Sequence, residues 1–132
     1  MQAQCGLIGK DLSQSLSPFI HSRAQELLKK QVNYQVFPLK KSQLEKFLKE
    51  FWEKGGLGLN VTAPYKEDVA KILNSPCKSV NTLWRGENFW SSASTDIEGL
   101  ELFLASEKKS LFSFNSLFCL GAGGVVTALR DY

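Results

Sequence analysis

The stretch LGLNVTAPYKEDVAKIL, residues 57–73, combines a strand pattern and a helix pattern in one short segment. Residues 57–61 are a short apolar run typical of a buried strand, and a helix is predicted from about Pro64 to Leu73. The same order occurs twice earlier in the chain. There the predicted strands are residues 4–9 and 33–39, and the predicted helices begin at Pro18 and cover 42–54. This β-α-β-α-β-α order predicts an α/β fold with a mainly parallel twisted sheet flanked by helices.

The rest of the chain predicts a hairpin and then the start of a second unit. Residues 79–93 are typical of a hairpin that turns at 86–88, and residues 96–107 of an amphipathic helix. Residues 116–120 are one more apolar strand, and a glycine-rich turn and a helix follow it. We therefore predict a first domain at residues 1–107 and, at 108–132, a linker with the truncated start of another domain.

The helix that begins at Pro18 carries apolar residues at helical spacing. Ile20, Ala24, Leu27 and Leu28 fall on one face, which predicts the packing face of this helix. Pro18 suits the first helical position, so Ser17 is the predicted N-cap.

Composition indicates a globular protein and excludes several classes. Of 132 residues, 43% are hydrophobic and 22% are charged, and the net charge of +3 comes from lysines scattered over predicted helix faces. A nucleic-acid partner is therefore not expected. No signal peptide and no run of 18 apolar residues is found, so no membrane partner is expected either. One histidine and three cysteines without a CxxC pair argue against a metal site and fit a reducing cytoplasm.

Three serines alternate just before the Pro18 helix, at positions 13, 15 and 17. A helix cap explains only Ser17. A helix N-terminus with nearby hydroxyls favours an anion. Because alternation aims Ser15 and Ser17 the same way, the pattern predicts a carboxylate in front of the helix.

Two charged residues at predicted helix starts form a candidate catalytic pair. Lys66 lies in the first turn of its helix, where a cation opposes the helix dipole at a cost of about 0.3–1 kcal/mol. Such local rule-breaking is a mild indication of function, although a solvated lysine offset by Glu67 and Asp68 explains it as well. Asp96 follows Thr95, which with Glu98 matches a capping box. A carboxylate beside the Lys66 amine would help it to exchange a proton with a substrate oxygen.

Two further stretches carry chemistry. Asn81 falls in a predicted strand, where asparagine is disfavoured, and its amide either binds a ligand hydroxyl or marks a strand end. Gly121, Ala122, Gly123 and Gly124 stand between a predicted strand and a helix, a setting that allows close approach of a pyrophosphate.

Together these motifs resemble the shikimate dehydrogenase family, from Gly9 to about Ala128. The family pattern Ser-x-Ser-Pro-x-x-His matches residues 15–21, Asn-Val-Thr-x-Pro-x-Lys matches 60–66, and Val-Asn-Thr matches 80–82. Gly-Ala-Gly-Gly matches 121–124, and Asn-Thr-Asp-x-x-Gly matches 94–99 except that Ser94 replaces the asparagine.

The resemblance implies a substrate-binding domain followed by the first β-α unit of a Rossmann domain that binds NADP. Ser15 and Ser17 would bind the carboxylate of shikimate. Ring hydroxyls would be held by Thr62, Asn81, and Asn60 or Asp96. Lys66 and Asp96 would manage the proton while hydride passes between nicotinamide and C3, in the reversible reduction of 3-dehydroshikimate during aromatic amino-acid biosynthesis. His21 would be a structural residue.

Several alternatives stay open at this point. The family's chains continue through a complete cofactor domain, so these 132 residues alone are expected to be inactive, either as a fragment or as a natural short form. A non-catalytic module that binds shikimate or quinate is the alternative function. NADP and NAD are not distinguished. The apolar strand in 116–124 would be an exposed edge, which predicts a homodimer.

Overall fold

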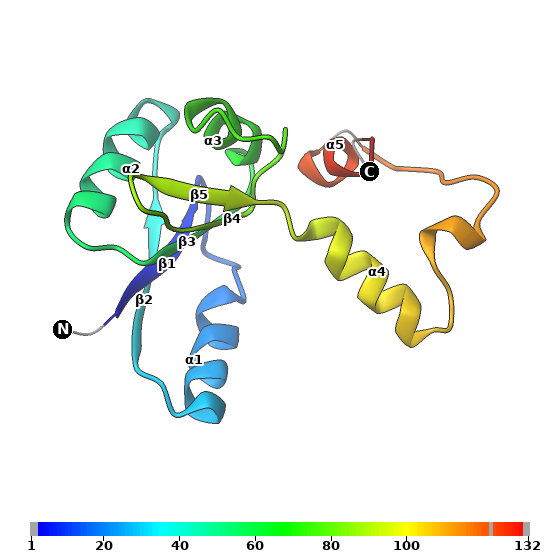
Figure 1. Ribbon diagram of the computed structural model, residues 1–132, viewed down its shortest axis with the longest axis horizontal. Helices are drawn as coiled ribbons and strands as arrows, with labels where there is room; N and C mark the ends of the chain where they lie inside the picture. The colour runs from blue at the N-terminus through cyan, green and yellow to red at the C-terminus, as the bar shows by residue number, and fades with distance from the viewer. Residues whose placement is uncertain (1–2, 122, 131–132) are drawn as a thin grey trace.

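The computed structural model describes residues 3–121 and 123–130, and its centre is one five-stranded sheet (Figure 1). The strand order is β2-β1-β3-β4-β5. The strands are β1 (Ala3–Gly9), β2 (Val32–Pro38), β3 (Gly58–Val61), β4 (Thr82–Arg85) and β5 (Trp90–Ala93). β1 pairs in parallel with β2 and β3, and β3-β4-β5 are antiparallel. The predicted α/β class is confirmed. Strands β2, β1 and β3 form the parallel part, and the predicted hairpin, β4 and β5, lies at one edge.

Helices cover both faces of this sheet (Figure 1). α1 (Ser17–Leu28) lies on one face. α2 (Leu44–Glu53), preceded by the 3-10 turn η1 (Lys41–Gln43), and α3 (Lys66–Ile72) lie on the other. After β5 the chain leads away from the sheet through α4 (Asp96–Ser106), the 3-10 turn η2 (Leu111–Ser113) and α5 (Gly124–Arg130), and α4 contacts α5.

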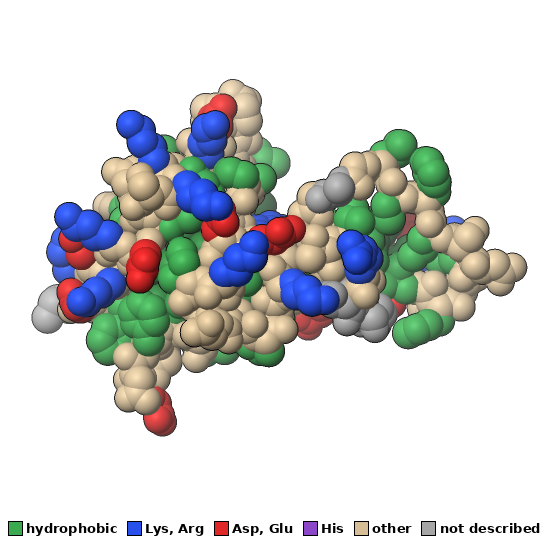
Figure 2. Space-filling model, turned by 90° about the horizontal axis from the view of Figure 1, so that it is seen from above, with side chains coloured by type: hydrophobic (Ala, Val, Ile, Leu, Met, Phe, Trp, Pro, Cys, Tyr) green, Lys and Arg blue, Asp and Glu red, His purple; other side chains and the backbone are tan. Residues whose placement is uncertain are grey.

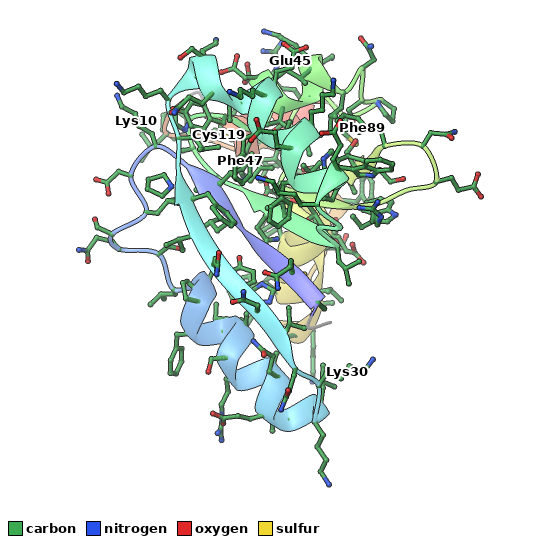
Figure 3. The ribbon with its side chains drawn as sticks, turned by 90° about the vertical axis from the view of Figure 1, so that its left-hand side faces the viewer. Lys10, Lys30, Glu45, Phe47, Phe89 and Cys119 are labelled. Carbon is green, nitrogen blue, oxygen red and sulfur yellow. The ribbon has the colours of Figure 1, made fainter. Side chains whose placement is uncertain are left out.

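The alternation of side chains along β3 separates an apolar face from a polar one. Leu59 and Val61 point to the side of α2 and α3 and are 2% exposed, whereas Asn60 points to the side of α1. The apolar face carries the core, in which Phe47 of α2 packs on Phe37 at 4.8 Å between ring centroids (Figure 3). The buried members of this core are Ile8, Leu44, Leu48, Leu59, Val61, Tyr65, Val69, Ala70, Val80, Leu83 and Trp90.

The predicted packing face of α1 is wrong. Ile20, Leu27 and Leu28 are exposed, and no residue of this helix is buried. The helix turns His21 toward the sheet instead, where the imidazole stacks on Tyr34. A polar and aromatic contact thus replaces the apolar one that the spacing predicted.

Two predicted elements differ in the structure. The helix predicted from Pro64 begins two residues later, because a turn in which the Tyr65 N–H donates to the Thr62 carbonyl at 3.1 Å comes first. Residues 116–120 form no strand. Within residues 3–121 and 123–130 the sheet ends at β2 and β5, and neither edge pairs with this segment. An isolated strand leaves its backbone hydrogen-bonding groups without partners.

Charged side chains of both signs share the face of the molecule that Figure 2 shows. On the face seen in Figure 2, lysine and arginine side chains are spread out among acidic ones. In the described part of the chain, no helix is long and apolar enough to cross a membrane.

Candidate functional site

The site residues lie where the parallel strands β1 and β3 end. β1 is followed by the loop 10–16, which leaves the sheet near Lys10 and turns back into α1, and α1 ends near Lys30 (Figure 3). β3 is followed by residues 62–65 and then by α3. The Thr62 N–H donates to the Ile8 carbonyl at 3.0 Å, which holds the two chain segments together. Carboxyl ends of parallel strands are where α/β proteins bind ligands.

The three alternating serines have three different roles. Ser13 donates from its hydroxyl to Asp11 Oδ1 at 2.8 Å, a local turn contact that also lowers the pKa of Asp11. Ser15 Oγ accepts the Ser17 N–H at 3.2 Å. The predicted N-cap is therefore wrong: Ser17 is already helical, and the preceding Leu16 makes no side-chain cap. The Ser15 hydroxyl thus accepts a backbone N–H at the start of α1 that has no partner within the helix.

Two cavities meet at Thr62. One, of about 330 Å³, is lined by Ser15 and Thr62 together with residues 11–14. The other, of about 640 Å³, brings Thr62 and Lys66 together with Gly123 and Gly124. Of the predicted site residues, Ser15, Thr62, Lys66, Gly123 and Gly124 thus line adjoining spaces.

Lys66 and Asp96 are brought together as the sequence predicted. Lys66 Nζ lies 2.6 Å from Asp96 Oδ2, and the two side chains are only 17% and 16% exposed. Lys66 is the first residue of α3, and Asp96 is the first residue of α4. A charge-assisted hydrogen bond of this length fixes the amine in a largely enclosed position.

Asn81 holds Asp96 from the other side. It lies just before β4, and its Nδ2 donates to Asp96 Oδ1 at 2.8 Å and to Thr95 Oγ1 at 3.0 Å. Its Oδ1 accepts the Thr95 N–H at 3.0 Å and the Thr82 hydroxyl at 2.9 Å. The predicted capping box of Thr95 is absent, because Asn81 engages the Thr95 hydroxyl. Both amide hydrogens of Asn81 are donated within the protein, and one of them fixes the Asp96 carboxylate.

Asn60 is the centre of a second polar cluster. Its Oδ1 accepts the Tyr34 hydroxyl at 2.8 Å and lies 3.1 Å from His21 Nε2. Burial raises the pKa of Tyr34 to about 12, and a hydrogen bond from the Ser17 side chain opposes this rise in pKa. Tyr34 therefore links the predicted residues Ser17 and Asn60.

The glycine turn lies beside the lysine. Gly121 has a φ of +108°, a conformation that favours glycine, and the space around Gly123 is open to 4 Å. A Cβ at Gly124 would lie 2.7 Å from Ser79 Oγ and 3.1 Å from Lys66 Cδ. Ala122 lies outside the described residues.

Sequence reasoning missed Tyr34 and assigned His21 only a structural part. A tyrosine in a strand is common and gave no signal. His21 did offer one, because it stands four residues after Ser17 and so shares a helix face with it. In residues 3–121 and 123–130 there is no group of three histidine, cysteine or acidic side chains that could hold a metal ion.

Comparison with known proteins identifies the family. Residues 7–83 match the model of the shikimate dehydrogenase substrate binding domain. The chain is 33% identical over 132 residues to shikimate dehydrogenase (NADP(+)) from Synechocystis, covering 94% of this chain and 44% of that protein. It therefore spans about half the length of the curated relatives it matches.

Solved structures give the same result. A crystal structure of shikimate dehydrogenase 1 from Peptoclostridium difficile superposes with a TM-score of 0.83 at 31% identity, over 99% of this chain and 50% of that one. For shikimate 5-dehydrogenase from Thermus thermophilus in complex with shikimate, the TM-score is 0.84 at 28% identity, over 98% of this chain and 53% of that one. On the family match, the shared fold and the paired Lys66 and Asp96, this chain belongs to the shikimate dehydrogenase family and carries its substrate-binding domain.

Proposed function

We propose that this chain is the substrate-binding half of an NADP-dependent shikimate dehydrogenase, which interconverts 3-dehydroshikimate and shikimate. The observation that carries the proposal is the enclosed ion pair of Lys66 and Asp96, 2.6 Å apart, beside Thr62 and the cavity that Thr62 shares with Ser15. A paired amine and carboxylate next to hydroxyl donors suits a substrate that carries a carboxylate and several hydroxyls.

In this proposal the loop before α1 binds the carboxylate. Ser15 lines the smaller cavity, and the Ser17 hydroxyl lies at Tyr34 on the neighbouring strand. Thr62 and the amide of Asn60 would bind ring hydroxyls. Asn81 would act mainly by holding Asp96, because its hydrogen bonds already join Asp96, Thr95 and Thr82.

Lys66 would move the proton. One of its ammonium hydrogens is held by Asp96, which leaves two for a substrate oxygen. When the C3 ketone is reduced, Lys66 would give a proton to the oxygen, and it would take one back when the alcohol is oxidised. Asp96, fixed by Asn81, would keep the amine aimed at that oxygen throughout.

The glycine turn fits a dinucleotide at the observed backbone. The positive φ of Gly121 and the open space at Gly123 would let phosphate oxygens approach the main chain. Gly121, Ala122, Gly123 and Gly124 would hold the NADP, and the cofactor when bound supplies or accepts the hydride.

The test is a titration of the chain with shikimate, followed by two-dimensional NMR. We expect shifts at Ser15, Ser17, Lys66 and Asp96. Ser15→Ala should weaken binding about tenfold or more, because a hydrogen bond to a charged group contributes about 1.5–3 kcal/mol. Ser106→Ala is the matched control: its hydroxyl donates to the Phe103 carbonyl in α4 and lines neither cavity, so the Kd should stay within about twofold. Absence of binding, or equal losses in both variants, would contradict the proposal.

Three further expectations, on the domain boundary, the location and the oligomeric state, belong to this proposal. The division of the chain at residues 107 and 108 is a prediction, and so is a cytoplasmic location. A homodimer is supported by exposed apolar side chains at Leu117, Phe118 and Leu120, and sedimentation at increasing concentration would check it.

A further inference from the structure

His21 stands in the polar cluster on the α1 side of the sheet. Its imidazole stacks on the ring of Tyr34, with centroids 3.9 Å apart and an interplanar angle of 14°. Its Nε2 lies 3.1 Å from Asn60 Oδ1, the same oxygen that accepts the Tyr34 hydroxyl at 2.8 Å. Three elements, α1, β2 and β3, thus converge on one carbonyl oxygen.

Two donors on one amide oxygen decide the orientation of that amide. Asn60 Oδ1 has two lone pairs, and Tyr34 and His21 occupy both when His21 Nε2 carries a proton. If the amide turned over, its NH₂ group would face the His21 N–H and that hydrogen bond would be lost, while the Tyr34 hydroxyl would have to change from donor to acceptor. With His21 in that form, the NH₂ group is the part of Asn60 that would be left to meet a ligand.

The stack on Tyr34 holds the His21 imidazole in place beside Asn60. Contact between the two rings limits the rotation of the imidazole, and the Tyr34 hydroxyl lies against the same oxygen that Nε2 reaches. A histidine donates from Nε2 in its Nε2–H tautomer and in its doubly protonated form, but not in its Nδ1–H tautomer. The Nε2–H tautomer of His21 therefore goes with the Asn60 oxygen facing the ring, and the Nδ1–H tautomer with the NH₂ group facing it.

We propose that His21 is a positioning residue, which with Tyr34 fixes the side-chain amide of Asn60 so that its NH₂ group donates to an oxygen of the bound substrate. This inference rests on the proposed function, because it concerns the same shikimate site. It gives a part in binding to a residue that sequence reasoning left as structural.

Two substitutions separate the hydrogen bond from the ring stack. His21→Gln keeps an Nε2 donor at the same number of bonds from Cβ but removes the ring. His21→Phe keeps a ring to stack on Tyr34 but removes the donor. We expect His21→Phe to weaken shikimate binding about fivefold to tenfold, as for a lost hydrogen bond, and His21→Gln to stay within about twofold of the wild type.

NMR of the unsubstituted chain supplies readouts that do not depend on binding. Long-range ¹H–¹⁵N spectra should show His21 as the Nε2–H tautomer at neutral and alkaline pH. The side-chain NH₂ resonances of Asn60 should move in His21→Phe and should move much less in His21→Gln. A role confined to stability would instead follow the loss of the stacked ring, and His21→Gln would then be the more affected variant.

The outcomes distinguish this inference from the proposed function. If the wild-type chain fails to bind shikimate, the proposed function fails, while the tautomer and the Asn60 resonances still test the amide orientation. If shikimate binds but His21 is the Nδ1–H tautomer, or His21→Phe binds as tightly as His21→Gln, the positioning role is overturned. The tautomer decides the question even if His21→Phe does not fold.

Discussion

At the residue scale, the site is built from side chains that hold other side chains. Asn81 holds Asp96, Asp96 holds Lys66, and Tyr34 lies between Ser17 and Asn60. Such contacts reduce the freedom of the groups that would touch a substrate, so that less ordering is needed when it binds. The sequence predicted the pair of Lys66 and Asp96 through its resemblance to the family motifs that contain both residues. It did not predict Tyr34, since only the strand register places that hydroxyl beside Asn60.

The ionisation of Tyr34 tests this partly buried network. Burial raises the pKa of Tyr34 from 10.0 to about 12 in the folded chain. The protonated phenol is thus favoured by folding: its contribution to stability is complete below pH 10 and is lost as the pH rises through about 12. The phenolate absorbance of the wild type minus that of Tyr34→Phe should show one step near pH 12 in the folded chain and one near pH 10 in concentrated urea. A step near the ordinary pKa in the folded chain would mean that Tyr34 is solvated.

At the element scale, periodicity predicted which segments are strands and helices better than it predicted what their faces contact. The strands at 57–61 and 79–93 form nearly where expected, because apolar runs and turn residues act locally. The contact face of α1 was wrong, because helical spacing locates an apolar stripe without saying whether a partner covers it. Residues 116–120 have strand composition, but composition cannot supply the neighbouring strand that pairing requires.

Gly124 gives a test of how α5 meets the site. An alanine Cβ there would lie 2.7 Å from Ser79 Oγ, and Ser79 is 2% exposed and has little room to move. Alanine favours a helix over glycine by up to about 1 kcal/mol, but a contact this short outweighs that gain. Gly124→Ala should therefore shift the amide resonances of Lys66 and Glu67, the latter because Thr127 of α5 donates to its carboxylate at 3.0 Å. Gly123→Ala meets open space and should leave these resonances unchanged. Equal spectra for the two variants would mean that α5 does not pack on Lys66.

At the scale of the whole molecule, the sheet is stabilised chiefly from one side. The buried cluster lies between the strands and α2 and α3, and α1 adds no buried residue to it. The other side carries the polar cluster around Asn60, with Trp84 47% exposed on the same face of the sheet. The packed core and the Asn60 cluster therefore lie on opposite faces of one sheet, and substitutions on the two faces should have different effects.

Two leucines on two helices test this division. Leu48 of α2 is fully buried in the cluster, and its carbonyl accepts the Trp90 indole N–H at 2.9 Å, whereas Leu28 of α1 is 67% exposed. Leu48→Ala should lower the free energy of unfolding by about 2–5 kcal/mol, because it removes buried contacts and leaves a cavity. Leu28→Ala should change it by about 0.5 kcal/mol or less. Urea unfolding followed by tryptophan fluorescence measures both values. A large loss for Leu28→Ala that grows with protein concentration would instead show that a second copy covers the apolar face of α1, and the asymmetry of the single chain would then not hold in solution.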